Sequence, residues 1–149
     1  MMRSLLLLAL LWSGAASAQR LTVHVGPPAL GSGGSNPVSV PPVNPIDYEF
    51  VWLTKTDHEW SASILPGLFY GKRLWVGTNA GSRKGPYVSY GAGLLLNYQG
   101  VGPGVYSAFG LDQCGSSYCF NVEVKQALGL TGGRFTSAYA LRVGMSFLF

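Results

Sequence analysis

The stretch RFTSAYALRVGMSFLF, residues 134–149, alternates between two kinds of side chain. One parity is apolar, interrupted only by Ser137, and the other is small or polar. Because successive side chains of a strand point to opposite faces, the stretch predicts one long strand with an apolar face and a small, polar face. A strand that ends on an aromatic residue, as this one does at Phe149, favours a membrane strand over a frayed strand of a water-soluble sheet.

The rest of the chain is hydrophobic overall but never for long. Charged residues make up 11% of it. After residue 18, no segment is apolar over the roughly 20 residues that a spanning helix needs. This combination is typical of strands that show one face to lipid. The net charge of +4 is small and dispersed, so the composition does not indicate a nucleic-acid partner.

The first 47 residues differ from those that follow. MMRSLLLLALLWSGAASA, residues 1–18, has a basic start, an apolar run and small residues at its end, which predicts a secretory signal peptide cut after Ala18. Residues 19–47 carry six of the nine prolines and are predicted to be extended or flexible. Within them, the alternation of residues 21–25 predicts a short first strand.

Residues 48–149 are predicted to form the β-barrel domain. Seven strands are expected there, and the short strand at 21–25 makes eight, the smallest even number found in bacterial single-chain barrels. The predicted fold is therefore all-β, an antiparallel up-and-down transmembrane β-barrel of eight strands.

One predicted strand contains a proline. His58–Gly71 is read as a single strand, although Pro66 cannot donate to a sheet ladder. The alternative, a turn after Pro66, would place Lys72 on the apolar face of the next strand. On the single-strand interpretation, Trp60 and Tyr70 are about 33 Å apart along the strand and mark two aromatic girdles.

The girdle prediction also includes Tyr98 and Tyr139.

If His58–Gly71 is one strand, Lys72 and Arg73 lie in the turn that follows it, as solvated residues or contacts to lipid phosphates. Residues 74–80 are then predicted to form a weaker strand.

The polar parity of the last two strands carries isolated charges. Glu123 and Lys125 lie on one predicted strand and Arg142 on its neighbour. An eight-stranded barrel is just wide enough for side chains to fill it. We therefore expect these three residues to form a charge network that plugs the lumen.

Two cysteines, Cys114 and Cys119, enclose a four-residue segment. An exported chain meets oxidising conditions, so the spacing predicts a disulfide across a tight hairpin. Closing such a small loop stabilises a protein by roughly 2 kcal/mol.

The final stretch resembles the C-terminal signature of bacterial outer-membrane β-barrel proteins. Arg142, Gly144, Phe147 and Phe149 occupy its polar, glycine and aromatic places. The whole chain is similar to small eight-stranded barrels of the outer-membrane protein A type. The resemblance implies an outer-membrane location, contact with outer-membrane lipid, and recognition of these four residues by the barrel assembly machinery during insertion.

Two other classes remain open as alternatives. A secreted soluble β-sandwich binding module also has alternating strands. Some outer-membrane barrels modify lipid, and one deacylase family uses a histidine and a serine two residues apart. Neither His24 nor His58 has a serine at that spacing, and neighbours such as Asp57, Glu59 and Ser61 cannot form a local catalytic constellation with His58 because strand neighbours alternate faces.

No catalytic, cofactor-binding or metal site is predicted from any motif. The expected role is structural, in interaction or in envelope maintenance, with no catalysis and no wide pore.

Overall fold

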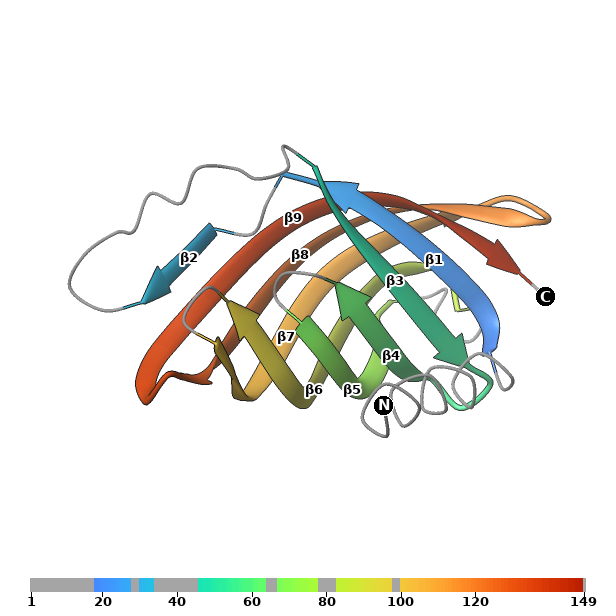
Figure 1. The fold of residues 1–149 in the computed structure, drawn as a ribbon. Coiled ribbons are helices and arrows are strands. Elements are labelled where there is room, and N and C mark those ends of the chain that lie inside the picture. Colours follow the sequence, from blue (N-terminus) through green and yellow to red (C-terminus); the bar gives the residue numbers. More distant parts are fainter. Residues whose placement is uncertain are drawn as a thin grey trace, which may run out of the picture.

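The polypeptide forms one sheet of antiparallel strands that closes on itself (Figure 1). The structure is a computed structural model, and it describes residues 18–27, 30–33, 46–63, 67–77, 83–97 and 100–148. Among these residues there is no helix long and apolar enough to cross a membrane. The predicted signal peptide lies outside the described residues except for Ala18, which begins the first strand.

Nine strands follow one another in the described parts of the chain. They are β1 (Ala18–Gly26), β2 (Leu30–Gly33), β3 (Asp47–Thr54), β4 (His58–Ser63), β5 (Gly67–Trp75), β6 (Gly85–Asn97), β7 (Gly100–Cys114), β8 (Tyr118–Thr131) and β9 (Arg134–Leu148). From β3 to β9, each strand pairs with the next in antiparallel register.

The first strand closes the barrel. β1 pairs with β3 on one side, where Leu21 lies opposite Trp52, and with β9 on the other, where Leu21 lies opposite Phe147. The short β2 pairs with the earlier part of β9, beyond the end of β1. The predicted fold, an eight-stranded antiparallel up-and-down barrel, is confirmed, and the segment at 21–25 belongs to it as part of β1.

The barrel wall is much taller on one side. Strands β6 to β9 are 13 to 15 residues long, whereas β3, β4 and β5 have eight, six and nine residues. In Figure 1 the long strands therefore extend beyond the ends of β4 and β5. The ion-paired part of the lumen lies where both sides of the wall are present.

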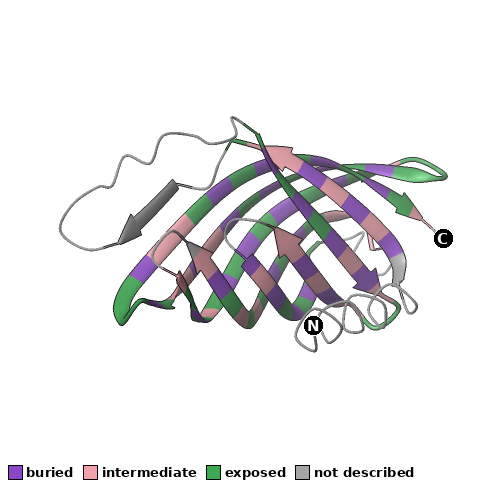
Figure 2. Cartoon of the chain, viewed as in Figure 1, coloured by how far each residue is buried: buried purple, intermediate pink, exposed green. Residues whose placement is uncertain are grey.

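Side chains alternate between an apolar exterior and a polar interior (Figure 2). Along β8, for example, Phe120, Val122 and Val124 are exposed while Asn121, Glu123 and Lys125 are buried. Large apolar side chains are exposed on all the strands from β3 to β9 except β4. A soluble sandwich buries its apolar faces between two sheets. The single closed sheet with a charged interior therefore excludes the sandwich alternative.

The prediction of one strand over His58–Gly71 is wrong. The segment forms two antiparallel strands, β4 and β5, and Trp60 lies directly opposite Tyr70 with ring centroids 4.5 Å apart. The argument that these two aromatics mark opposite girdles is therefore wrong as well. β5 begins at Gly67, whose φ of 137° is a conformation that favours glycine.

Because of this error, the residues that follow Gly71 were also assigned wrongly. Lys72 and Arg73 are not in a turn but inside β5, which continues to Trp75. No separate strand begins at Leu74, and residues 78–80 lie outside the described residues. The predicted count of seven strands after residue 47 was correct, because one strand too few before Lys72 was compensated by one too many after it.

Glycines on the inner face make room for two tyrosines. A Cβ atom at Gly110 would lie 2.2 Å from the Cζ of Tyr87, and one at Gly71 would lie 2.5 Å from the Oη of Tyr106. Because no real Cβ comes so close, the rings of Tyr87 and Tyr106 occupy space that any other residue would fill. Both hydroxyl groups are thereby brought to carboxylates in the lumen.

Candidate functional site: the charged lumen

The interior of the barrel holds an unusual density of buried charge. The buried ionisable side chains are Arg20, His24, Asp47, Glu49, Glu59, Arg73, Asp112, Glu123, Lys125 and Arg142. They come from β1, β3, β4, β5, β7, β8 and β9. Charges with so little water are retained only when they are paired and hydrogen-bonded.

Glu49 on β3 is the centre of one group of ion pairs. It is fully buried and forms ion pairs with Lys125 of β8 and Arg142 of β9. Its Oε2 also lies 3.2 Å from Nδ1 of His24. Arg142 has a second carboxylate partner in Asp47, at 2.8 Å. One carboxylate of β3 thus connects three strands across the lumen.

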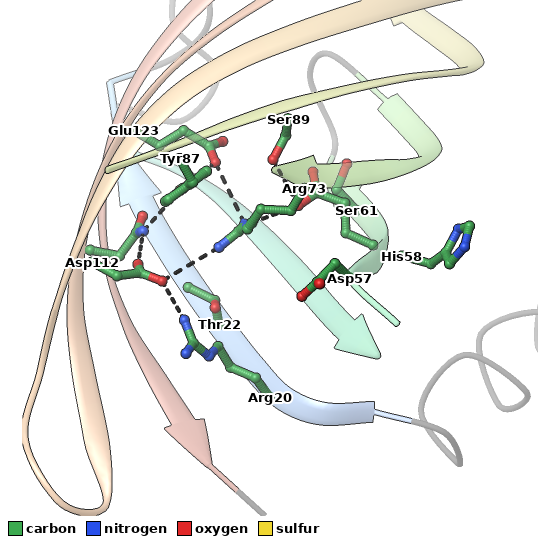
Figure 3. Close-up of polar contacts among 12 residues, drawn as sticks. Arg20, Thr22, Asp57, His58, Ser61, Arg73, Tyr87, Ser89, Asp112 and Glu123 are labelled. Carbon is green, nitrogen blue, oxygen red and sulfur yellow. Dashed lines mark hydrogen bonds and ion pairs between the residues drawn. The ribbon is translucent and has the colours of Figure 1, made fainter. Parts of the chain in front are cut away.

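Arg73 on β5 is the centre of a second group (Figure 3). Its Nε donates to Glu59 at 2.9 Å, and its two terminal nitrogens lie 3.6 Å from Asp112 and 3.9 Å from Glu123. The guanidinium lies over the ring of Tyr87, 3.8 Å from the centroid. Such stacking on an aromatic face is a contact that arginine makes better than lysine.

Neutral donors complete the coordination of the carboxylates. Tyr106 Oη donates to Glu59 at 2.6 Å and Ser89 Oγ donates to the same group at 3.0 Å. Tyr87 Oη donates to Glu123 at 2.7 Å and accepts from Asn121 at 2.9 Å. Hydrogen bonds to ionised groups are stronger than neutral ones, so these contacts fix the carboxylates in place.

The two groups form one network. Glu123 lies near both central cations, 3.9 Å from Arg73 and 3.9 Å from Lys125. Arg20 extends the network toward the start of β1 through its ion pair with Asp112. Five carboxylates therefore share four lysine or arginine side chains and a histidine. This near balance of charge is what a buried ionic cluster requires.

Apolar side chains fill the lumen next to the network. Phe69, Leu95, Tyr106, Ala108 and Ala127 form a buried cluster whose members come from β5, β6, β7 and β8. Phe69 and Tyr106 are in ring contact, with centroids 5.2 Å apart. Tyr106 belongs to both parts, since its ring is in the apolar cluster and its hydroxyl binds Glu59.

The residues predicted to plug the lumen lie there. Glu123, Lys125 and Arg142 are each about 1% exposed. Their expected contacts were with one another on neighbouring strands. The structure has Glu123 and Lys125 3.9 Å apart, and it also joins Lys125 and Arg142 through Glu49 of β3, which lies on the other side of β1 from β9.

Several network members were missed from the sequence. Arg73 was placed in a turn, and Arg20 and Asp112 were not singled out. The signal was present in β5, where Phe69, Gly71 and Arg73 share one parity and are all buried. If the alternation of β5 had been extended past Lys72, Arg73 would have been assigned to the inner face.

The predicted assembly residues are described in part. Phe147 faces outward, whereas Arg142 and Gly144 face the lumen. A Cβ at Gly144 would lie 2.3 Å from Cδ2 of His24, so the glycine leaves room for a network residue. Phe149 lies outside the described residues, as does Tyr98 of the predicted girdle.

The predicted disulfide is confirmed. Cys114 and Cys119 are bonded and join the end of β7 to the start of β8. The bond is at the end of the barrel where β1 begins. Arg20 is at this end too, opposite Leu53 of β3 and Leu148 of β9.

One trio in the network has metal-ligand side chains. Ligand atoms of His24, Glu49 and Glu123 lie within 4.8 Å of one another. However, Glu49 already contacts Lys125 and Arg142, whose charges occupy the positions that a cation would take. The donor set therefore fits internal ion pairing better than a metal ion.

The histidine and serine near the β3–β4 turn face opposite ways. His58 points out of the barrel and contacts the Tyr70 hydroxyl at 2.8 Å, while Glu59 and Ser61 are buried in the lumen. Figure 3 shows His58 directed away from the network. These neighbours are thus on opposite faces, as strand alternation predicts.

The arrangement as a whole can neutralise charge and fill space within a closed wall. It joins strands that are distant in sequence, since Lys125 and Glu49 are 76 residues apart. Comparisons of the chain with protein-family models, with curated proteins and with solved structures found no match.

Proposed function

We propose that this chain is an integral outer-membrane β-barrel protein with a structural, interaction or envelope-maintenance role, closed to free diffusion through its lumen. The observation that carries the proposal is the inverted distribution of side chains. Apolar residues face outward around the wall, and the charged residues face inward. Lipid, rather than water, is the solvent that such an exterior fits.

The exterior is too apolar to be explained as a protein surface in water. Phe109, Phe135 and Val101 are each 60% exposed or more, and they lie among many other exposed apolar side chains. Monomeric soluble proteins rarely show contiguous apolar patches beyond a few hundred Å². The predicted export signal at residues 1–18 points to the same location.

The lumen supports a closed barrel rather than a pore. Arg73 and Glu49 cross it with ion pairs, and the Phe69 cluster fills the neighbouring part. An interior of eight strands has no room for both these side chains and a column of water.

Five measurements test the proposal and its enzymatic alternative. Protein extracted from membranes should migrate differently on a gel before and after heating, and it should show β-rich circular dichroism in detergent. Release by high-salt or carbonate washing would refute the membrane location. In planar bilayers we expect no steady openings, and openings of the size of an aqueous pore would refute the closed lumen. Mass spectrometry of lipid A with and without expression tests the enzymatic alternative.

A further inference from the structure

The outer surface of the barrel carries one continuous row of polar side chains. The row runs directly across six neighbouring strands, each member opposite the next: His58, Lys72, Tyr90, Ser107, Gln126 and Tyr139. All six side chains face outward, since their strand neighbours on either side face the lumen. Local alternation alone does not place polar residues of six strands in one register.

The rows beside it are mostly apolar. On one side, the outward residues in register are Leu74, Val88, Phe109, Val124 and Leu141. On the other side they are Trp60, Tyr70, Ala92, Val105, Leu128 and Ser137, of which Tyr70 and Ser137 carry hydroxyl groups. The polar row is therefore a narrow line within an apolar surface, and not part of a generally polar wall.

The row crosses the apolar surface at an angle. Strands about 4.8 Å apart and tilted by about 40° change depth by about 3 Å from one strand to the next. Five steps cover about 15 Å, more than half of an apolar band about 25 Å tall. The charged end is at the rim, because His58 starts β4 and the amide of Arg73, next to Lys72, donates to Asp57 of the β3–β4 turn at 2.8 Å.

Some polar groups of the row satisfy one another. Gln126 Nε2 donates to Tyr139 Oη at 2.9 Å, and His58 lies against Tyr70 with a 2.8 Å contact and stacked rings. Lys72 differs, since no ion pair within the described parts of the chain includes it. A lysine on an apolar surface needs an anion or water at its ammonium group.

The chain has no carboxylate to offer Lys72. Of its six acidic residues, five are buried in the lumen: Asp47, Glu49, Glu59, Asp112 and Glu123. The sixth, Asp57, is paired with Arg83 at 3.0 Å and accepts from the indole of Trp75 at 3.2 Å. A second copy of the chain has the same distribution, so it offers no exterior side-chain carboxylate either. An anion at Lys72 would therefore come from another molecule.

We propose that this row is a binding site for an anionic phospholipid, with the phosphate at Lys72. The inference rests on the proposed membrane location. His58 and Tyr90, the neighbours of Lys72 in the row, border the phosphate. Ser107 and Gln126 offer hydrogen bonds to the neutral polar part of the headgroup and backbone, while the apolar rows on both sides take the acyl chains.

The test measures lipid retained by the folded, full-length barrel. Protein is reconstituted in nanodiscs that contain equal amounts of phosphatidylglycerol and phosphatidylcholine with the same acyl chains, and the retained lipids are counted by native mass spectrometry after release. Lys72→Gln should lower the preference for phosphatidylglycerol about fivefold, the loss of one lysine–anion contact near a membrane surface. Gln126→Leu should weaken retention of both lipids.

Matched controls separate a site from general attraction. Lys55→Gln and Lys84→Gln each remove one exposed charge that lies outside the strands and is not a member of the row, and they should leave the preference nearly unchanged. An equal loss from all three lysine variants would overturn the proposal in favour of diffuse electrostatic attraction. A dimer that Gln126→Leu abolishes would overturn it in favour of a second copy on the row.

Heat-modifiable migration, measured first for every variant, keeps the two proposals apart. If the wild-type protein shows no folded form in detergent and does not enter nanodiscs, the membrane location itself fails. If all variants fold and insert but retain the two lipids alike, only the lipid site fails.

Discussion

Replacing Glu49 with glutamine is expected to destabilise the barrel strongly. The substitution keeps the size of the side chain and removes the charge that Lys125 and Arg142 share. Breaking a buried ion pair by removing one partner costs about 3–5 kcal/mol. Arg142 keeps Asp47 at 2.8 Å. Lys125 keeps Ser61 at 3.1 Å, the ring of Tyr106 at 4.8 Å and the more distant carboxylate of Glu123 at 3.9 Å. We therefore expect Glu49→Gln to lower the free energy of unfolding by about 3–5 kcal/mol.

The assay is reversible unfolding by urea in lipid vesicles, followed by the fluorescence of Trp52, Trp60 and Trp75, the tryptophans that remain after the predicted cleavage. Asp57→Asn is the matched control, because it also neutralises an ion-paired carboxylate. That pair, with Arg83, is at the rim, and the two side chains are 27% and 28% exposed. Exposed pairs contribute about 0–1 kcal/mol. Asparagine also tolerates the φ of 62° at this position.

A double variant distinguishes the loss of a charge pair from a general packing defect. In Glu49→Gln with Lys125→Met, the unpaired ammonium is gone as well, so the double variant should be less destabilised than the sum of the single variants by about 1–3 kcal/mol. If Glu49→Gln costs no more than Asp57→Asn, the lumen network does not hold the barrel together and the reasoning is wrong.

Two further predictions use the same unfolding measurement. Gly110→Ala places a Cβ 2.2 Å from Tyr87 Cζ and should cost about 1–3 kcal/mol, whereas the Cβ of Gly115→Ala would lie 3.7 Å from the carbonyl oxygen of Tyr118 and should change stability by less than about 0.5 kcal/mol. Equal effects would contradict the assigned position of the tyrosine. Replacing Cys114 and Cys119 together with serine should cost roughly 2 kcal/mol and leave a heat-modifiable barrel, because the loop that the bond closes is short. Loss of the folded form would show that the bond is essential for the hairpin.

The fold was largely predictable because alternation is a local property. In β8 and β9 each residue reports its face by its own polarity, so Phe120, Glu123 and Arg142 were assigned to the correct sides. The even strand count then required a first strand before residue 48, and β1 supplies it. Two-residue periodicity does not show where a strand ends when both sides of a turn alternate. This is why β4 and β5 were read as one.

The partners within the lumen were not predictable in the same way. Which inward residues meet depends on the tilt of the strands and the closure of the sheet, and neither is a local property. Glu49 and Arg142 are neighbours because β3 and β9 flank β1, and alternation cannot indicate that Glu49 reaches past β1 to a residue near the other end of the chain. The sequence supports a list of inward charges, and the closed barrel decides their pairs.

The misplaced turn at Lys72 has a physical cause that bears on function. A turn after Pro66 was rejected because it would leave a lysine on the apolar face of the next strand, and the structure has that lysine on that face. The rejection assumes that every outward side chain of a membrane barrel contacts lipid tails alone. In the proposed membrane location, a lysine at the rim with a line of hydrogen-bonding side chains beside it would face the headgroup of a lipid. This departure from the apolar pattern is then informative. The fold does not require a charge at this outward position, so the charge points to a ligand outside the protein.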